Sequence, residues 1–184
     1  ISIKDDYIKT LDRAEAFFKD NKNSVLCWGN HDWAYYTDHS CSGNKPECRS
    51  LVKRWYELSG IEPKMLYTID DVIFSHAGLS DSFDYYHNSE DIDDLEYWIE
   101  QVNKDALDKD PIFWREDSPL WVRPQASTIS MYPNIQVVGH TPVEHAYFDC
   151  NILSTDTFST YYNKNLGNCK LTIIDTETYE IEEV

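Results

Sequence analysis

Three segments of the chain share one layout: an apolar run of strand length, a small residue, and then a side chain that can bind a metal ion. The segments are Trp28-Gly29-Asn30-His31, Phe74-Ser75-His76-Ala77-Gly78 and Val138-Gly139-His140. In layered α/β proteins, ligands gather beyond the carboxyl ends of the strands. We therefore expect Asn30, His76 and His140 to converge on one place. The alternative is that Asn30 caps a helix and both histidines are core residues, which leaves the shared layout unexplained.

The types of these side chains indicate a divalent ion. Two imidazoles and an amide oxygen suit borderline ions such as Mn, Fe, Zn or Ni. Because the oxygen of Asn30 is neutral, the ion would keep most of its charge, polarise a phosphoryl oxygen and lower the pKa of bound water. His31 directly follows a candidate ligand, so we expect it at the rim of the site. An imidazole there is suited to protonating a leaving alkoxide near neutral pH.

Glycine is concentrated at the same three places. The chain has only 6 glycines, and Gly29, Gly78 and Gly139 are half of them. A residue without a side chain lets the backbone turn sharply and pass close to an ion. The glycines therefore support one shared site.

Alternating helices and strands must position these residues. Helical spacing of apolar residues predicts helices over Asp5–Asp20, over Arg49–Ser59 with Gly60 as its C-terminal cap, and around Leu95–Val102. The expected strands are Ser24–Trp28, Met65–Thr68, Val72–Phe74, Ile135–Val138, Asn151–Leu153, Lys170–Ile174 and Tyr179–Glu182. We expect loops over Tyr35–Pro46 and Asp81–Asp94, and irregular structure over Pro111–Ser130. This alternation favours a layered α/β domain.

Composition excludes several classes of protein. The apolar fraction of 41% and the aromatic fraction of 14% are too high for a disordered chain. A net charge of −17 disfavours nucleic acid and anionic membranes as partners. No apolar run reaches the roughly 18 residues of a membrane span. The 5 cysteines form no CxxC pair, which excludes a zinc ribbon. The lack of a glycosylation sequon and of a visible signal peptide favours the cytoplasm.

The three motifs, in this order, resemble the later motifs of the calcineurin-like metallophosphoesterases. The matching residues are Gly29-Asn30-His31-Asp32, Ser75-His76-Ala77-Gly78-Leu79-Ser80 and Gly139-His140-Thr141-Pro142. The resemblance is to the bacterial and phage branch, which is similar to Ser/Thr protein phosphatases and to symmetrical diadenosine tetraphosphatases. It covers essentially the whole chain. It implies an αββα sandwich with mixed sheets, in which two metal ions about 3.5 Å apart support hydrolysis by metal-activated hydroxide.

The resemblance also implies roles for individual residues. Asn30, His76 and His140 would bind the second metal, and His31 would be the general acid. An arginine of this branch grips the phosphate, which a planar guanidinium does in a bidentate manner. Arg123, in Trp121-Val122-Arg123, matches this arginine best, and Arg115, after Trp114, is the second candidate.

Two motifs of the family have no match in these 184 residues. They are an Asp-x-His pair and a Gly-Asp-x-x-Asp-Arg-Gly segment, which supply the first metal site and the aspartate that orients the catalytic histidine. They would precede Asp5–Asp20, so a first strand–helix–strand unit is expected to be missing. A smaller departure is Asp156-Thr157-Phe158, where the family often has Asp-Thr-Gly. Because an incomplete sheet exposes an apolar edge, we predict either a homodimer or a disturbed region near the N-terminus.

Residues 1–184 are thus predicted to form one N-terminally incomplete phosphoesterase domain. The expected activity is metal-dependent hydrolysis of a phosphomonoester, a phosphoprotein or a dinucleoside polyphosphate. The alternative is a catalytically incomplete module of the same fold that binds phosphate groups or a partner protein. The missing first-metal ligands favour this alternative.

Overall fold

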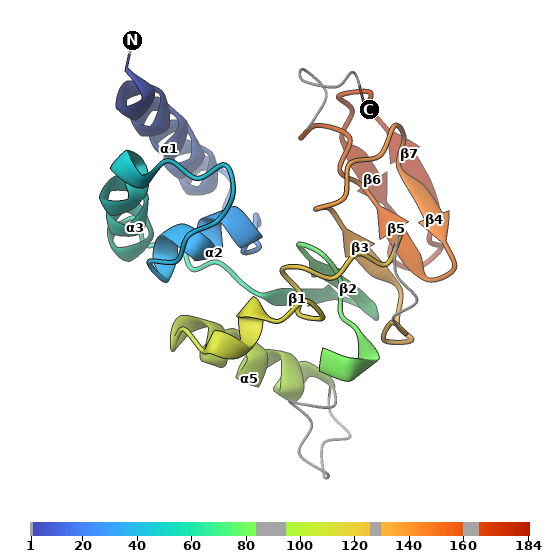
Figure 1. Cartoon of the computed structure of the whole chain (residues 1–184). Helices are drawn as coiled ribbons and strands as arrows, with labels where there is room; N and C mark the ends of the chain where they lie inside the picture. The colour runs from blue at the N-terminus through green and yellow to red at the C-terminus, as the bar shows by residue number, and fades with distance from the viewer. Residues whose placement is uncertain (1, 84–94, 126–129, 160–165) are drawn as a thin grey trace. The chain divides into compact units, whose positions relative to one another are not determined.

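A computed structural model describes residues 2–83, 95–125, 130–159 and 166–184 of the chain (Figure 1). The chain divides into two compact units, an N-terminal unit of residues 1–64 and a C-terminal unit of residues 65–184. In the described parts of both units, no helix is long and apolar enough to cross a membrane.

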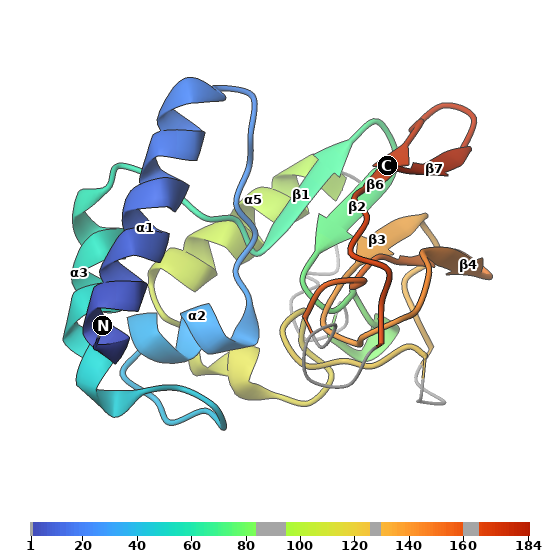
Figure 2. The ribbon, with the colours of Figure 1, turned by 90° about the horizontal axis from the view of Figure 1, so that it is seen from above.

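Helices build the N-terminal unit. They are α1 (Ile3–Asp20), α2 (Asn30–Tyr36), the short 3₁₀ helix η1 (Pro46–Cys48) and α3 (Arg49–Leu58). A capping box begins α1, because the Ser2 hydroxyl accepts from the Asp5 amide and the Asp5 carboxylate accepts from the Ser2 amide. Helix α1 lies beside α3 (Figure 2). Gly60, with φ of 73°, follows the Ser59 cap of α3, as predicted.

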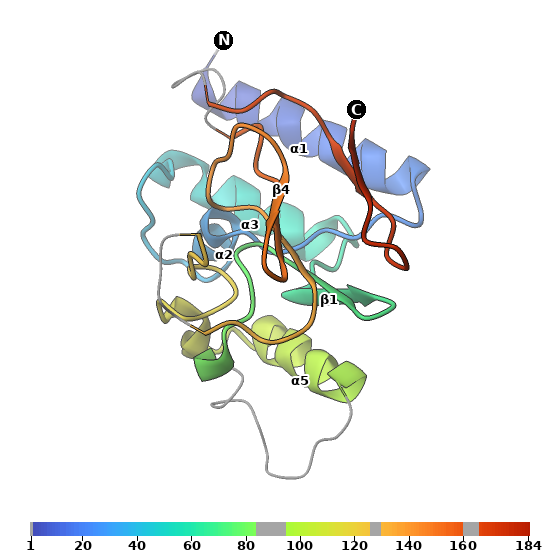
Figure 3. The same cartoon turned by 90° about the vertical axis from the view of Figure 1, so that its right-hand side faces the viewer.

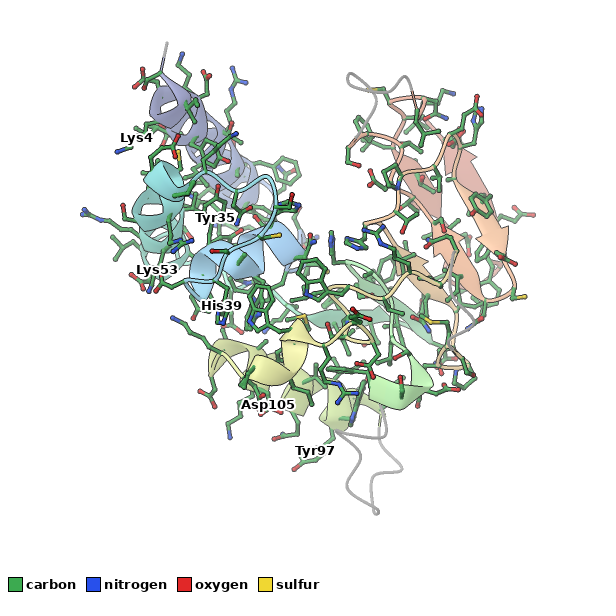
Figure 4. All side chains as sticks on the ribbon, in the orientation of Figure 1. Lys4, Tyr35, His39, Lys53, Tyr97 and Asp105 are labelled. Atoms are coloured by element: carbon green, nitrogen blue, oxygen red, sulfur yellow. The ribbon has the colours of Figure 1, made fainter. Side chains whose placement is uncertain are left out.

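Aromatic side chains form much of the core of this unit. Trp28 and Trp33 are fully buried, and the Trp28 ring packs against Tyr36 and Tyr56 with centroid distances of 4.8 and 4.6 Å. The hydroxyl of Tyr35, which Figure 4 labels on α2, lies 3.0 Å from the hydroxyl of Tyr7 on α1. The core therefore fixes the position of α2, the helix that begins with Asn30 and His31.

The prediction of a regular strand over Ser24–Trp28 is wrong. Only Cys27 pairs, in an isolated parallel bridge with Lys64. The Trp28 amide donates to the Lys64 carbonyl at 2.9 Å, and the Lys64 amide donates to the Leu26 carbonyl at 2.8 Å.

A mixed five-stranded sheet is the centre of the C-terminal unit. Its order is β1-β2-β3-β5-β4, where β1 is Leu66–Ile69, β2 Val72–Ser75, β3 Gln136–Val138, β4 Tyr147–Asp149 and β5 Ile152–Ser154. The three central strands β2, β3 and β5 are parallel, and β1 and β4 pair antiparallel at the edges. Strands β6 (Thr172–Ile174) and β7 (Ile181–Glu183) form a separate antiparallel pair.

Helix α5 (Leu95–Leu107) packs against this sheet at β1 (Figure 3). Its buried face carries Trp98, Ile99, Val102 and Ala106. Tyr97 is half exposed and extends away from the sheet (Figure 4). Asn103 on α5 accepts from the amides of Met65 and Leu66 and donates to the Leu66 carbonyl, so its amide group pairs with backbone at the start of β1.

The architecture is the mixed α/β type that the sequence predicts. Helices α1, α3 and α5, the β1–β2 hairpin, β3 and the later strands β5, β6 and β7 lie within a few residues of their predicted positions. The region Pro111–Ser130 contains the short 3₁₀ helix η2 (Pro111–Trp114) and turns where it is described. Helix α2, whose last two residues were predicted as part of a loop, and strand β4 were not predicted. Most of Asp81–Asp94 lies outside the described residues.

Glu183 on β7 ties three backbone segments together. Its carboxylate accepts from the Ala146 amide at 2.8 Å, from the Asn168 side chain at 2.9 Å and from His145 Nδ1 at 3.0 Å. These hydrogen bonds, the Ala146 amide first, lower the pKa of Glu183 from 4.5 to about 2. The ionised carboxylate is thus stabilised by the folded structure.

Glu183→Gln is expected to lower stability at neutral pH. Because the pKa of Glu183 is lower in the folded than in the unfolded chain, its contribution is fully present above pH 4.5 and is lost as the pH falls toward 2. The difference in urea midpoint between wild type and variant should therefore shrink across this window. Glu182→Gln, at the exposed neighbouring position, is the control. A Glu183→Gln difference that is independent of pH would contradict the prediction.

Candidate functional site

His76 and His140 lie at the ends of two adjacent parallel strands. Strand β2 is in register with β3, with Ser75 opposite Val138, and the two histidines follow these strand ends. His140 Nδ1 is 2.9 Å from His76 Nε2, and the ring centroids are 4.7 Å apart. The predicted approach of these two histidines is therefore present in the C-terminal unit.

The spacing of the two nitrogens fits a shared metal ion. An imidazole nitrogen binds Zn at about 2.0–2.1 Å, so two such nitrogens lie about 2.9 Å apart at right angles around an ion and about 3.3 Å apart in the tetrahedral geometry that Zn prefers. The observed separation equals the right-angle value of a six-coordinate ion, and one ring donating a hydrogen bond to the other gives the same distance. Imidazole nitrogens are also the donor type that borderline divalent ions prefer. The pair thus fits part of an ion's coordination shell.

Backbone hydrogen bonds hold the two histidine loops together. The Gly139 amide donates to the His76 carbonyl at 2.9 Å, and the Thr141 amide turns back to the Gly139 carbonyl at 2.6 Å. His140 itself has a φ of 61°, in the left-handed region that non-glycine residues seldom adopt. Such backbone conformations concentrate at functional sites, where the surrounding structure maintains them.

A buried glutamine fixes the loop that follows His76. Gln136, fully buried in β3, accepts from the Leu79 amide at 2.7 Å and donates to the carbonyls of Leu79 and Tyr132, each at 3.0 Å. Gly78 has a φ of 120°, and a Cβ there would lie 2.8 Å from the Met131 methyl group. The sequence alone places Gln136 in an apolar strand and predicts no role for its side chain. The one hint is that Gln136 is the single polar residue within that strand.

Gln136→Leu is expected to destabilise the chain by about 2 kcal/mol, because the buried Leu79 amide would lose the side-chain oxygen to which it donates. Urea unfolding measures the loss. Gln101→Leu, at a half-buried position on α5, is the control and should change stability little. Equal stabilities of the two variants would contradict the role assigned to Gln136.

Arg123 lies next to the histidine pair. Its Nη1 donates to the Thr141 hydroxyl at 3.1 Å, and Thr141 directly follows His140. The Trp121 ring meets the His140 ring edge to face, with centroids 6.2 Å apart. The segment Trp121-Val122-Arg123 therefore borders this part of the site, as the better of the two arginine candidates should.

Arg115 is held by a carboxylate instead. Its Nε and Nη2 each donate to Asp117 at 2.9 Å, which is a bidentate pair. The hydrogen bond from Arg115 lowers the pKa of Asp117. Arg115 is the weaker candidate, because the two donors that could bind a phosphate in a bidentate manner already bind Asp117.

Asn30 and His31 begin α2 in the N-terminal unit. Asn30 is buried, and its side-chain oxygen accepts from the His31 amide at 3.0 Å. His31 is exposed, and its Nδ1 lies 2.8 Å from the Asn44 side-chain oxygen. Since the histidine pair belongs to the other unit, the convergence of Asn30 and His31 with His76 and His140 stays a prediction.

Asp32 lies against the aromatic core beside these residues. Its carboxylate accepts from the Tyr56 hydroxyl at 3.0 Å. Burial raises the pKa of Asp32, and the Tyr56 hydrogen bond and the nearby His31 act in the opposite direction. Burial likewise raises the pKa of Tyr56, so the pair favours a neutral phenol.

Among the residues that the structure describes, no group of three or more His, Cys, Asp or Glu side chains could hold a metal ion. His76 and His140 supply two side chains of these types, and the role of the Asn30 amide as a further ligand stays a prediction. The described residues therefore offer part of a metal site.

Comparison with known proteins identifies one family. Residues 3–166 match the family model of the calcineurin-like phosphoesterases. The chain is similar in structure to the cold-active protein-tyrosine phosphatase of a psychrophilic Shewanella species, with 15% identity and a TM-score of 0.51 over 86% of this chain and 58% of that one. A point mutant of a cold-active protein tyrosine phosphatase aligns with 17% identity and a TM-score of 0.48, over the same shares of the two chains. No curated protein matches significantly.

These solved structures are longer than the present chain, which spans 58% of their length. At 15% identity, the first of them supports the fold alone.

Proposed function

Because the chain belongs to the family of calcineurin-like phosphoesterases, we propose that its residues form the second-metal half of a phosphoester-hydrolysing site. The observation that carries the proposal is the contact of His76 with His140 at the ends of parallel strands. The family suggests hydrolysis of phosphoesters in general. A phosphomonoester, a phosphoprotein and a dinucleoside polyphosphate are the proposed substrates.

In this proposal each residue has one task. Asn30, His76 and His140 would hold a divalent ion, which when bound would polarise a phosphoryl oxygen and lower the pKa of water. Arg123 would bind two phosphoryl oxygens through its planar guanidinium and hold the ester in place. His31 would give a proton to the leaving oxygen, so that an alcohol departs rather than an alkoxide.

The proposed ions are Mn, Fe, Zn or Ni, with two per site in the complete family arrangement. A cytoplasmic location and a homodimer remain predictions from the sequence. The phosphorylated substrate is the partner that the family implies.

The direct test is hydrolysis of 4-nitrophenyl phosphate by the 184-residue chain with added Mn. Turnover that requires Mn and disappears with a chelator is expected. Hydrolysis that continues in the chelator would contradict the proposal.

The second candidate is a phosphate-binding module of the same fold without turnover. The lack of a group of three His, Cys, Asp or Glu ligands among the described residues favours it. Isothermal titration with inorganic phosphate in the presence of Mn, run beside the hydrolysis assay, separates the two. Saturable binding without turnover would identify the module.

Arg123→Lys is expected to reduce kcat/KM by about 100-fold, because an ammonium group cannot make the bidentate contact of a guanidinium. Arg115→Lys is the matched control. Since Asp117 already holds this arginine, its replacement should change kcat/KM by less than about threefold. The reverse order of effects would assign the phosphate contact to Arg115.

A further inference from the structure

The loop after α2 folds back onto His31. Asn44 contacts the histidine twice: its side-chain oxygen lies 2.8 Å from His31 Nδ1, and its side-chain nitrogen donates to the His31 carbonyl at 3.2 Å. The Cys41 sulfur is 3.8 Å from the same Nδ1. One side chain therefore contacts both the ring and the backbone of His31.

These two contacts determine the orientation of the Asn44 amide. The His31 carbonyl only accepts hydrogen bonds, so the atom that faces it must be the donating nitrogen of Asn44. The oxygen of the amide then faces His31 Nδ1. Because that oxygen only accepts, Nδ1 must carry a hydrogen.

We infer that Asn44 is a positioning residue that holds His31 in the Nδ1–H tautomer. In this tautomer Nε2 carries the ring's lone pair, and it is the nitrogen that takes up and releases the second proton. This step rests on the proposed function: Nε2 of His31 is the nitrogen that donates the proton to the leaving group.

Gly43 fits the backbone conformation of this loop. Its φ of 89° lies in the left-handed region, and a Cβ at this position would be 3.4 Å from His31 Cε1. The left-handed backbone, rather than lack of space, therefore favours glycine at this position, directly before Asn44.

The tautomer can be measured without any reaction. Two-dimensional NMR that correlates imidazole nitrogens with ring protons distinguishes Nδ1–H from Nε2–H in the metal-free 184-residue chain, at a pH where the measured nitrogen shifts show a neutral ring. We expect mainly Nδ1–H at His31 in the wild type. Asn44→Ala should shift it toward Nε2–H, which a solvated imidazole prefers, and Asn44→Asp should restore Nδ1–H because a carboxylate oxygen also accepts.

Two controls accompany this measurement. His39, which Figure 4 labels beyond α2, has its Nδ1 2.9 Å from the Thr37 carbonyl and should keep its signals in every variant. Ser42→Ala, at an exposed position in the same loop, should leave His31 unchanged. Mainly Nε2–H at wild-type His31, or the same tautomer in wild type and Asn44→Ala, would overturn the inference.

Kinetics provide a second readout with Mn present. Asn44→Ala should lower kcat roughly 10-fold with KM nearly unchanged, as expected for loss of a group that orients a catalytic side chain. A rise in KM at constant kcat would overturn the positioning role. Since the NMR result is obtained without metal or substrate, it stands even if the chain proves not to hydrolyse phosphoesters.

Discussion

His76→Ala and His140→Ala should each weaken Mn binding by at least about 100-fold. The two ring nitrogens lie 2.9 Å apart, and removing either leaves at most one imidazole ligand for the ion. Changes to groups that merely support metal ligands cost 10–100-fold in affinity, so loss of a ligand should cost no less. Equilibrium dialysis followed by elemental mass spectrometry gives the affinity and the number of ions per chain.

His145→Ala is the matched control for this experiment, because His145 is an exposed histidine that contacts Glu183. Mn affinity within about twofold of the wild type in both site variants would contradict the assignment of the pair as metal ligands. About two ions per wild-type chain would mean that first-metal ligands are supplied in some way. One ion would mean that the chain holds a half-site.

His31→Ala should reduce kcat about 10²–10⁴-fold for an alkyl phosphate, the usual contribution of a general acid. The loss should be smaller for 4-nitrophenyl phosphate, because 4-nitrophenolate departs without needing a proton. Steady-state kinetics on both esters, with Mn content verified, measures this difference. His39→Ala is the control.

Equal losses on the two esters would argue against proton donation by His31. An unchanged kcat on the alkyl ester would remove His31 from the reaction altogether. Both results could be obtained with the metal site intact, so they separate the role of His31 from that of the histidine pair.

Much of the fold could be predicted because local patterns and tertiary structure agree. The β1–β2 hairpin follows from two apolar runs around Asp70, which adopts a φ of 52° in the turn. The spacing of Trp98, Ile99 and Val102 predicted α5, and these residues are buried. The contact of His76 with His140 could be predicted because both residues follow the carboxyl ends of strands, where ligands gather in α/β sheets. The contact also requires β2 and β3 to be parallel neighbours.

The remaining features depend on contacts distant in sequence. Ser24–Trp28 has the composition of a strand, but it pairs only through the single bridge between Cys27 and Lys64. Gln136 and Asn44 act on residues 57 and 13 positions away, through side-chain amides that no periodicity reveals. Arg115 and Arg123 both follow a tryptophan-containing segment, and the structure distinguishes them because Arg115 pairs with Asp117 whereas Arg123 donates to Thr141 beside His140.

The hydrogen bond from the Gly139 amide to the His76 carbonyl makes the two histidine loops one mechanical unit. Two imidazoles on independent loops would each lose conformational entropy when they met at an ion. Here that entropy is already lost when the sheet folds, so the pair would act as a bidentate chelate for the proposed ion. The rate of Mn release should therefore respond to substitutions that loosen this loop pair, even where both ring nitrogens are retained.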